Sequence, residues 1–87
     1  MAELVSLRNI GKAMEIKLKS VDISTAEELR EIGSKEAYLR LKMQYPKVCR
    51  VYLYSLEGAL AGTEYNRLPK ETMRDLKEYD DSLITHI

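Results

Sequence analysis

A short turn near the start of the chain constrains the fold more than any other sequence feature. Within Leu7–Lys12, Asn9 and Gly11 stand on either side of a single apolar residue, Ile10. Asparagine and glycine adopt a positive φ more readily than other residues, so the pattern predicts a tight turn with Ile10 pointing inward. The amphipathic run that follows, as far as Val21, predicts a helix that begins at this turn. Backbone N–H groups at such a helix start can bind a phosphate.

The rest of the chain has the pattern of short helices separated by turn residues. Apolar residues recur every three or four positions, as expected of helices that bury one face. The predicted helices cover about residues 4–10, 11–21, 25–33, 34–45, 48–62 and 69–79.

The clearest helix boundaries lie in the middle of the chain. Thr25 and Glu28 form a capping-box pattern, in which the Thr25 hydroxyl accepts from the Glu28 N–H and the Glu28 carboxylate reaches back to the Thr25 N–H. Gly33 is placed to end that helix, and Ser34 to cap the next one. Pro46 ends the following helix, because the residue before a proline is pushed out of helical geometry.

The segment Val48–Gly62 has two interpretations. The alternation over Val48–Tyr54 is typical of a strand, whereas apolar residues also recur every four positions as far as Gly62. The longer series favours a helix, which we expect to be the most buried of the domain. Its small residues, including Gly58, predict close approach by a neighbouring helix.

The end of the chain is expected to be less ordered than the rest. Pro69 suits the first turn of a final helix. Asp80 and Asp81 then oppose the helix dipole at the C-terminal end of that helix. We therefore expect an ordered core over about residues 4–79 and a frayed tail over 80–87.

Length and composition predict one domain over residues 1–87. The predicted fold is all-α, a compact bundle of five or six short helices. The single cysteine, Cys49, cannot form an internal disulfide, and no apolar run approaches the roughly 18 residues that a membrane span needs. No charged-then-apolar leader opens the chain, so we expect a cytoplasmic protein with no membrane partner.

Four segments carry a family resemblance when taken in order. They are the opening LRNIGKAMEIKL, the junction VDISTAEELREIG, the helix EAYLRLK and the block LYSLEGALAGTEYNRLP, and they cover about residues 4–79. Together they resemble the C-terminal domain of the TfoX (Sxy) family of competence regulators. The resemblance implies a bacterial regulatory domain with a helix-hairpin-helix, SAM-like fold, here as a stand-alone domain. Members of the family often have proline where this chain has Lys12 and tryptophan near Tyr65.

The candidate nucleic-acid site consists of the turn and its nearby cations. These residues are Arg8, Asn9, Gly11, Lys12 and Lys17. In helix-hairpin-helix proteins the backbone of a glycine-bracketed turn contacts phosphates without reading the base sequence. Asn9 replaces the first glycine, and we expect its side chain to crowd an approaching phosphate. The alternative is that the turn only joins two helices.

The charge distribution limits how strongly such a site can bind DNA. The formal net charge is zero, so no overall field attracts the chain to nucleic acid. Basic residues are concentrated in segments 1–20 and 35–50, and we interpret the second segment as a solvated helix face. Any DNA binding is therefore expected to be weak.

Six tyrosines, with no tryptophan or phenylalanine, dominate the aromatic content. Tyr38, Tyr45 and Tyr52 are expected to bury their rings and keep their hydroxyls near water. Tyr54 and Tyr65 are candidates for a partner interface, because tyrosine is enriched at interfaces. Packing in the core or partial exposure is the alternative for these two residues.

The rival function is protein interaction or homodimerisation, through the 48–62 helix, without nucleic-acid binding. A small enzyme is the third and weakest function class, because catalysis finds little support in the sequence. The only histidine, His86, lies in the predicted tail, and Cys49 is interpreted as a buried structural thiol. No zinc-site spacing, P-loop or dinucleotide fingerprint is present. We therefore predict no enzymatic activity, no cofactor, no metal and no small-molecule substrate.

Overall fold

The predicted helical segments become five α-helices and one 3₁₀ turn in the computed structural model, which describes residues 2–86, with side chains as far as Leu83. The elements are η1 (Leu4–Ser6), α1 (Lys12–Ser20), α2 (Ala26–Ile32), α3 (Ser34–Gln44), α4 (Arg50–Ala61) and α5 (Lys70–His86). The all-α prediction is confirmed. The strand-like start of the 48–62 segment is part of α4, so the helical interpretation of that segment is also confirmed.

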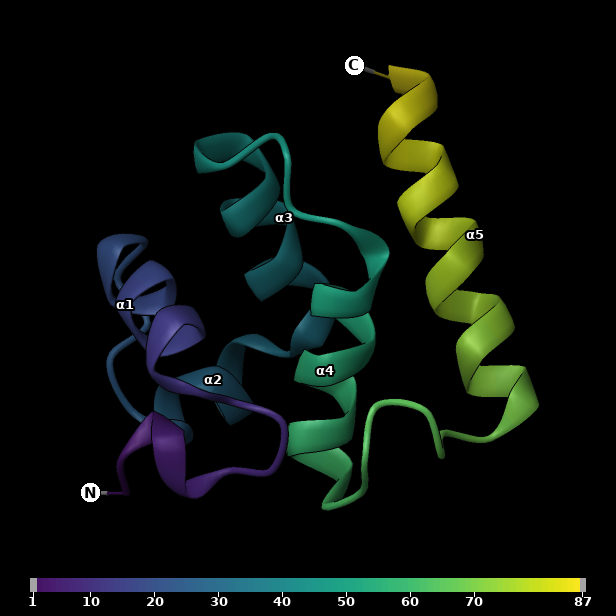
Figure 1. The fold of residues 1–87 in the computed structure, drawn as a ribbon. Helices are drawn as coiled ribbons and strands as arrows, with labels where there is room; N and C mark the ends of the chain where they lie inside the picture. Colours follow the sequence, from purple (N-terminus) through teal and green to yellow (C-terminus); the bar gives the residue numbers. More distant parts are fainter. Residues whose placement is uncertain (1, 87) are drawn as a thin grey trace.

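The helices are arranged around α4. Figure 1 shows α3 behind α4, with α1 and α2 on one side of this pair and α5 on the other. The core between them contains large side chains with no exposed surface, which are Leu4, Leu18, Ile23, Leu29, Tyr38, Leu41, Leu53 and Leu56. Among the described side chains of α5, Leu76 is the only buried apolar one, and Met73, Tyr79 and Leu83 are partly buried against the core. Polar contacts therefore also contribute to the attachment of this helix.

Local signals placed most helix ends correctly. The Thr25 hydroxyl accepts from the Glu28 N–H at 3.1 Å, as predicted, and also donates to the Glu28 carboxylate at 3.3 Å. Gly33 has a φ of 88° and ends α2. The predicted Ser34 cap is wrong, because Ser34 begins α3 and its hydroxyl donates to the Glu57 carboxylate at 2.6 Å.

Gly58 of α4 serves a different purpose from the predicted one. A Cβ atom on Gly58 would lie 2.5 Å from the side-chain nitrogen of Asn9 and 2.7 Å from the Thr63 carbonyl oxygen. A side chain from the first turn, rather than a neighbouring helix, therefore approaches α4 here. Gly62 ends α4 in the left-handed conformation with a φ of 74°.

A buried polar cluster joins α5 to α3 and α4. The Tyr38 hydroxyl donates to one Asp80 oxygen at 2.7 Å, and Arg50 Nε donates to the other at 2.9 Å. Arg50 also pairs with Asp81 at 2.7 Å. Burial alone would raise the pKa of Asp80, but the hydrogen bonds from Tyr38 and Arg50 outweigh it and hold that pKa below its ordinary value.

This cluster corrects two predictions. The ordered helix does not end before Asp80, because α5 continues through His86 and Asp80 is only 3% exposed. The Tyr38 hydroxyl does not lie near water, because the ring is fully buried and the hydroxyl is bonded to Asp80. Ile87, the last residue of the predicted tail, lies outside the described residues.

Candidate functional site

The turn before α1 has part of its predicted geometry. Asn9 has a φ of 72°, and Ile10 points inward and is buried. Gly11 is extended, with a φ of −94°, a conformation open to any residue. The predicted helix over residues 4–10 is wrong, because Leu7 is extended and limits the first element to the three residues of η1.

The Asn9 side chain is turned toward the end of α4. Its amide nitrogen donates to the Thr63 carbonyl at 2.9 Å and to the Ser55 carbonyl at 3.3 Å, and its oxygen accepts from the Tyr65 N–H at 3.3 Å. All three partners belong to α4 or to the segment that follows it, so the side chain is held against the rest of the domain. The expectation that Asn9 crowds an approaching phosphate is therefore wrong.

The outer side of the turn is open. Gly11 occupies the N-cap position of α1, where no side chain accepts from the first N–H groups of the helix. A Cβ atom on Gly11 would meet no atom within 4 Å. The Lys12 side chain is 81% exposed. An anion can thus reach the free N–H groups at the positive end of α1 without moving any side chain.

Acidic residues lie close to the cations of the turn. Arg8 pairs with Glu64 at 3.8 Å, and both side chains are exposed. Glu15 is buried, and its carboxylate forms ion pairs with Lys12 at 3.5 Å and with Lys19 at 3.8 Å. Exposed pairs such as Arg8–Glu64 contribute about 0–1 kcal/mol, so a phosphate can compete with them. They nevertheless leave little net positive charge at the turn.

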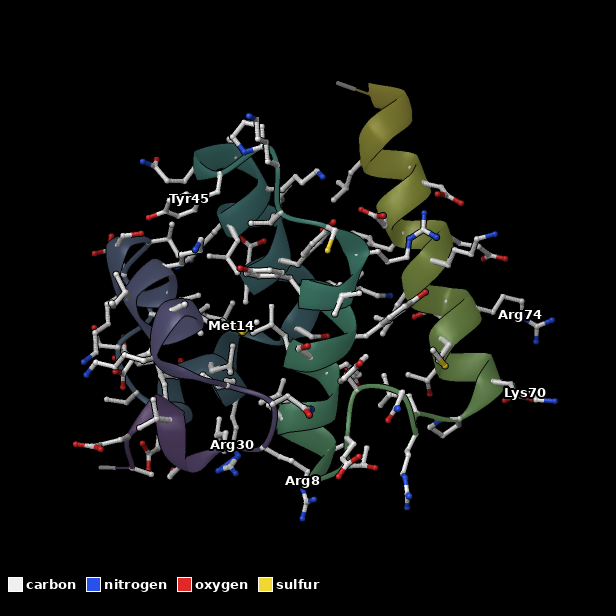
Figure 2. All side chains as sticks on the ribbon, viewed as in Figure 1. Arg8, Met14, Arg30, Tyr45, Lys70 and Arg74 are labelled. Carbon is white, nitrogen blue, oxygen red and sulfur yellow. The ribbon has the colours of Figure 1, made fainter. Side chains whose placement is uncertain are left out.

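The structure separates Lys17 from the other candidate residues. Its ammonium group lies 5.6 Å from the centre of the Tyr45 ring. Figure 2 shows Tyr45 and Arg8 at opposite ends of the molecule. The same view shows Arg30 of α2 at the edge from which Arg8 projects. Arg30 is exposed and has no ion pair among the described residues, and its position in an acidic segment hid it in the sequence.

The second basic segment does not extend the surface of the turn. Most of its cations are held by other groups of the domain. These contacts are Lys35 with Asp75 at 2.8 Å, Arg40 with Glu36 at 3.3 Å, Lys42 with the Val48 carbonyl at 2.8 Å and Arg50 with Asp80 at 2.9 Å. The interpretation of this segment as a solvated helix face is wrong for Arg50, whose charge is used to hold α5.

The two tyrosines expected at an interface differ in exposure. Tyr65 is 42% exposed and lies next to the turn through its N–H bond to Asn9. Tyr54 is half-buried and packs against the core. Of these two tyrosines, Tyr65 therefore has the ring with more surface available to a partner.

A shallow pocket lies at the other end of α1, and we call it the Tyr45 pocket. Its volume is about 500 Å³, and it is lined by Lys17, Gln44, Tyr45, Pro46, Lys47, Val48, Cys49 and Tyr52. No sequence pattern indicated this pocket, because its walls come from α1, the end of α3, the α3–α4 connection and α4. Cys49 is exposed at this pocket, so the interpretation of Cys49 as a buried thiol is wrong.

Two further observations concern other classes of chemistry. Over the part of the chain that the structure describes, no three His, Cys, Asp or Glu side chains are grouped so as to hold a metal ion. Within the same residues, no helix is long and apolar enough to cross a membrane. The His86 side chain lies outside the described side chains.

Comparison with known proteins gives consistent matches. The TfoX C-terminal domain family matches residues 1–79. Protein Sxy of Escherichia coli K12 is 36% identical over 80 residues, which cover 92% of this chain and 38% of Sxy. An uncharacterised Listeria monocytogenes protein in a triclinic crystal form is 41% identical, with a TM-score of 0.91 over 94% of this chain and 93% of that one. A tetragonal form of a Listeria monocytogenes protein of unknown function has a TM-score of 0.89 at 41% identity, over 92% and 99% of the two chains.

Proposed function

Because the chain belongs to the TfoX C-terminal domain family, we propose that it is a regulatory binding module that contacts nucleic-acid phosphates through the outer side of the Asn9–Lys12 turn. The observation that supports this most is the inward orientation of the Asn9 side chain. It leaves the free N–H groups at the start of α1 open to an anion, with Lys12 in the same turn of the helix.

The proposed contact is weak and independent of base sequence. Backbone N–H groups and exposed cations bind phosphate oxygens and do not read base edges. Three phosphate contacts would lower the affinity roughly 40-fold between about 50 and about 200 mM salt. The zero net charge adds no long-range attraction, so the affinity of the isolated domain should depend almost entirely on these local contacts.

The test is fluorescence anisotropy of a labelled duplex of about 20 base pairs, titrated with the protein at about 50 and about 200 mM salt. The informative variant is Gly11→Val. A Cβ atom at this position meets no atom within 4 Å, and the extended backbone suits a branched side chain, so we expect the fold to be retained while the outer side of the turn is covered. We expect the variant to weaken DNA binding at least tenfold.

The matched controls distinguish binding through the turn from binding by any exposed cation of the protein. Lys12→Gln should also weaken binding, whereas Lys77→Gln, on the exposed surface of α5, should not. Unchanged affinity in a folded Gly11→Val protein would contradict the proposal. Absence of any binding at the lower salt concentration would favour the rival function, a protein-interaction or homodimerisation module.

A further inference from the structure

The Tyr45 pocket combines an apolar floor with a positively charged rim. Val48 forms part of its buried floor, and the half-buried rings of Tyr45 and Tyr52 form part of its walls. The Tyr45 hydroxyl is already bonded to the Ser20 hydroxyl at 2.6 Å, so the ring position is fixed. Rigid tyrosine side chains in a shallow pocket are typical of the residues that contribute most to protein interfaces.

The charged side chains that line this pocket are all positive. Lys17 lies over the Tyr45 ring, and Lys47 has no ion pair with any described residue. None of the side chains that line the pocket is acidic. Behind the pocket, Lys42 donates to the Val48 carbonyl at 2.8 Å. The rim therefore attracts an anionic partner.

The start of α4 contributes little to this preference. Cys49 is the N-cap residue of α4, and no side chain caps the helix at this end. The first turn of α4, which the structure describes in full, contains no acidic residue. Asp80 and Asp81 of α5 nevertheless pair with Arg50 at this end of α4 and compensate much of the helix dipole, so the preference for a carboxylate depends on Lys17 and Lys47.

From these observations we propose that the Tyr45 pocket binds an acidic segment of a partner protein, which places an apolar side chain against Tyr45 and Tyr52 and carboxylates near Lys17 and Lys47. The apolar lining favours this partner over a nucleic-acid backbone, which has no apolar group to fill the pocket. Figure 2 shows Tyr45, in the wall of the pocket, and Arg8, in the turn, at opposite ends of the molecule, so this interaction uses different side chains from the proposed phosphate contact. Its small size indicates a weak, transient complex.

Cys49 provides a direct test, because it is exposed at the pocket and is the only cysteine of the chain. The measurement is the rate at which Cys49 reacts with iodoacetamide, followed by mass spectrometry of the intact protein. The probe is a short synthetic peptide in which a leucine–tryptophan pair is flanked by glutamates. At a peptide concentration about ten times its Kd, we expect the reaction to slow about tenfold.

Control peptides separate charge from apolar contact. A peptide with lysines in place of the glutamates, and one with serines in place of leucine and tryptophan, should each give little protection. In the protein, Lys47→Glu should reduce the protection, because it removes a cation from the rim of the pocket. The protection is measured as the ratio of the rates with and without peptide, so that any change in the intrinsic reactivity of the Cys49 thiol cancels. Lys77→Glu and Gly11→Val should retain the full protection.

Three results would overturn the proposal. One is a Cys49 rate that saturating peptide leaves unchanged. Another is equal protection by a DNA duplex, which would make this face a phosphate-binding surface. The third is protection that increases with protein concentration in the absence of peptide, which would identify a second copy of the chain as the occupant. If Gly11→Val loses DNA binding but the peptide still protects Cys49, phosphate binding at the turn and peptide binding at the Tyr45 pocket are independent of each other.

Discussion

Two polar junctions hold peripheral segments to opposite ends of α4, and they use different chemistry. Asn9 joins the turn before α1 to the C-terminal end of α4 through a neutral amide that both donates and accepts. Asp80 joins α5 to the N-terminal end of α4 through a buried carboxylate that only accepts. The first junction contacts backbone groups, whereas the second contacts the side chains of Tyr38 and Arg50.

The difference determines what each junction requires. The carbonyl partners at positions 55 and 63 are present in every residue, and the N–H at position 65 in every residue except proline. The Asn9 junction therefore depends mainly on Asn9 itself and on the space left by Gly58. The Asp80 junction requires particular partner side chains and a particular protonation state. We therefore expect the first to be sensitive to shape and insensitive to pH, and the second to be sensitive to both charge and pH.

The largest effect is expected from Arg50→Met, which removes the cation of the charged junction. It leaves the Asp80 carboxylate buried with only the Tyr38 hydroxyl as a donor, at a cost of about 3 kcal/mol in the free energy of unfolding. Urea unfolding followed by circular dichroism measures this loss. Arg74→Met, on the exposed surface of α5, is the control and should change stability by less than about 0.5 kcal/mol. Equal effects of the two variants would mean that the buried pair does not hold α5.

A smaller loss is expected from Asn9→Ala, which removes the amide of the neutral junction. The variant leaves three backbone groups without their partner and places alanine at a φ of 72°, for a total of about 2 kcal/mol. Asn9→Gly separates the two causes, because glycine accepts this φ but makes no side-chain bond. The same urea titration applies, with the exposed Asn66→Ala as the control. A loss no greater than that of Asn66→Ala would contradict the assigned role.

The smallest expected effect is a change in the free energy of unfolding at acidic pH. The pKa of Asp80 is lower in the folded state than in the unfolded chain, so its contribution is complete above the unfolded value of about 3.9 and is lost as pH falls through the folded value. The stability deficit of Asp80→Asn relative to the natural chain should therefore shrink between neutral and strongly acidic pH. The deficit of Asn9→Ala should stay constant over the same range. A constant deficit for both variants would show that the two junctions do not differ in pH dependence.

The parts of the fold that the sequence predicted depend on short-range interactions. The Thr25–Glu28 cap, the Gly33 helix end and the stop before Pro46 each involve residues within three or four positions of one another. The continuation of α5 through Asp80 was missed because its counter-charge, Arg50, lies thirty residues earlier in the chain. No local pattern distinguishes such a buried aspartate from a solvated one.

The candidate site was predicted in part for the same reason. The turn residues Asn9 and Ile10 were recognised from their local pattern, but the direction of the Asn9 side chain depends on Thr63, which lies 54 positions away. Lys17 was grouped with the turn by proximity in sequence, whereas its side chain lies over Tyr45 at the other end of α1. The Tyr45 pocket was missed because it exists only once α1, the α3–α4 connection and α4 are assembled.

The buried hydroxyl of Tyr38 has a consequence for the motions of the domain. Its proton is bonded to Asp80 and shielded from water on every side, so it can exchange with solvent only when the C-terminal half of α5 moves away from α3. Such an opening breaks the Asp80 cluster but leaves most of the apolar core in place, and it therefore requires less free energy than complete unfolding. The lifetime of this one proton is thus set by how often α5 opens and closes, a property that no static contact describes.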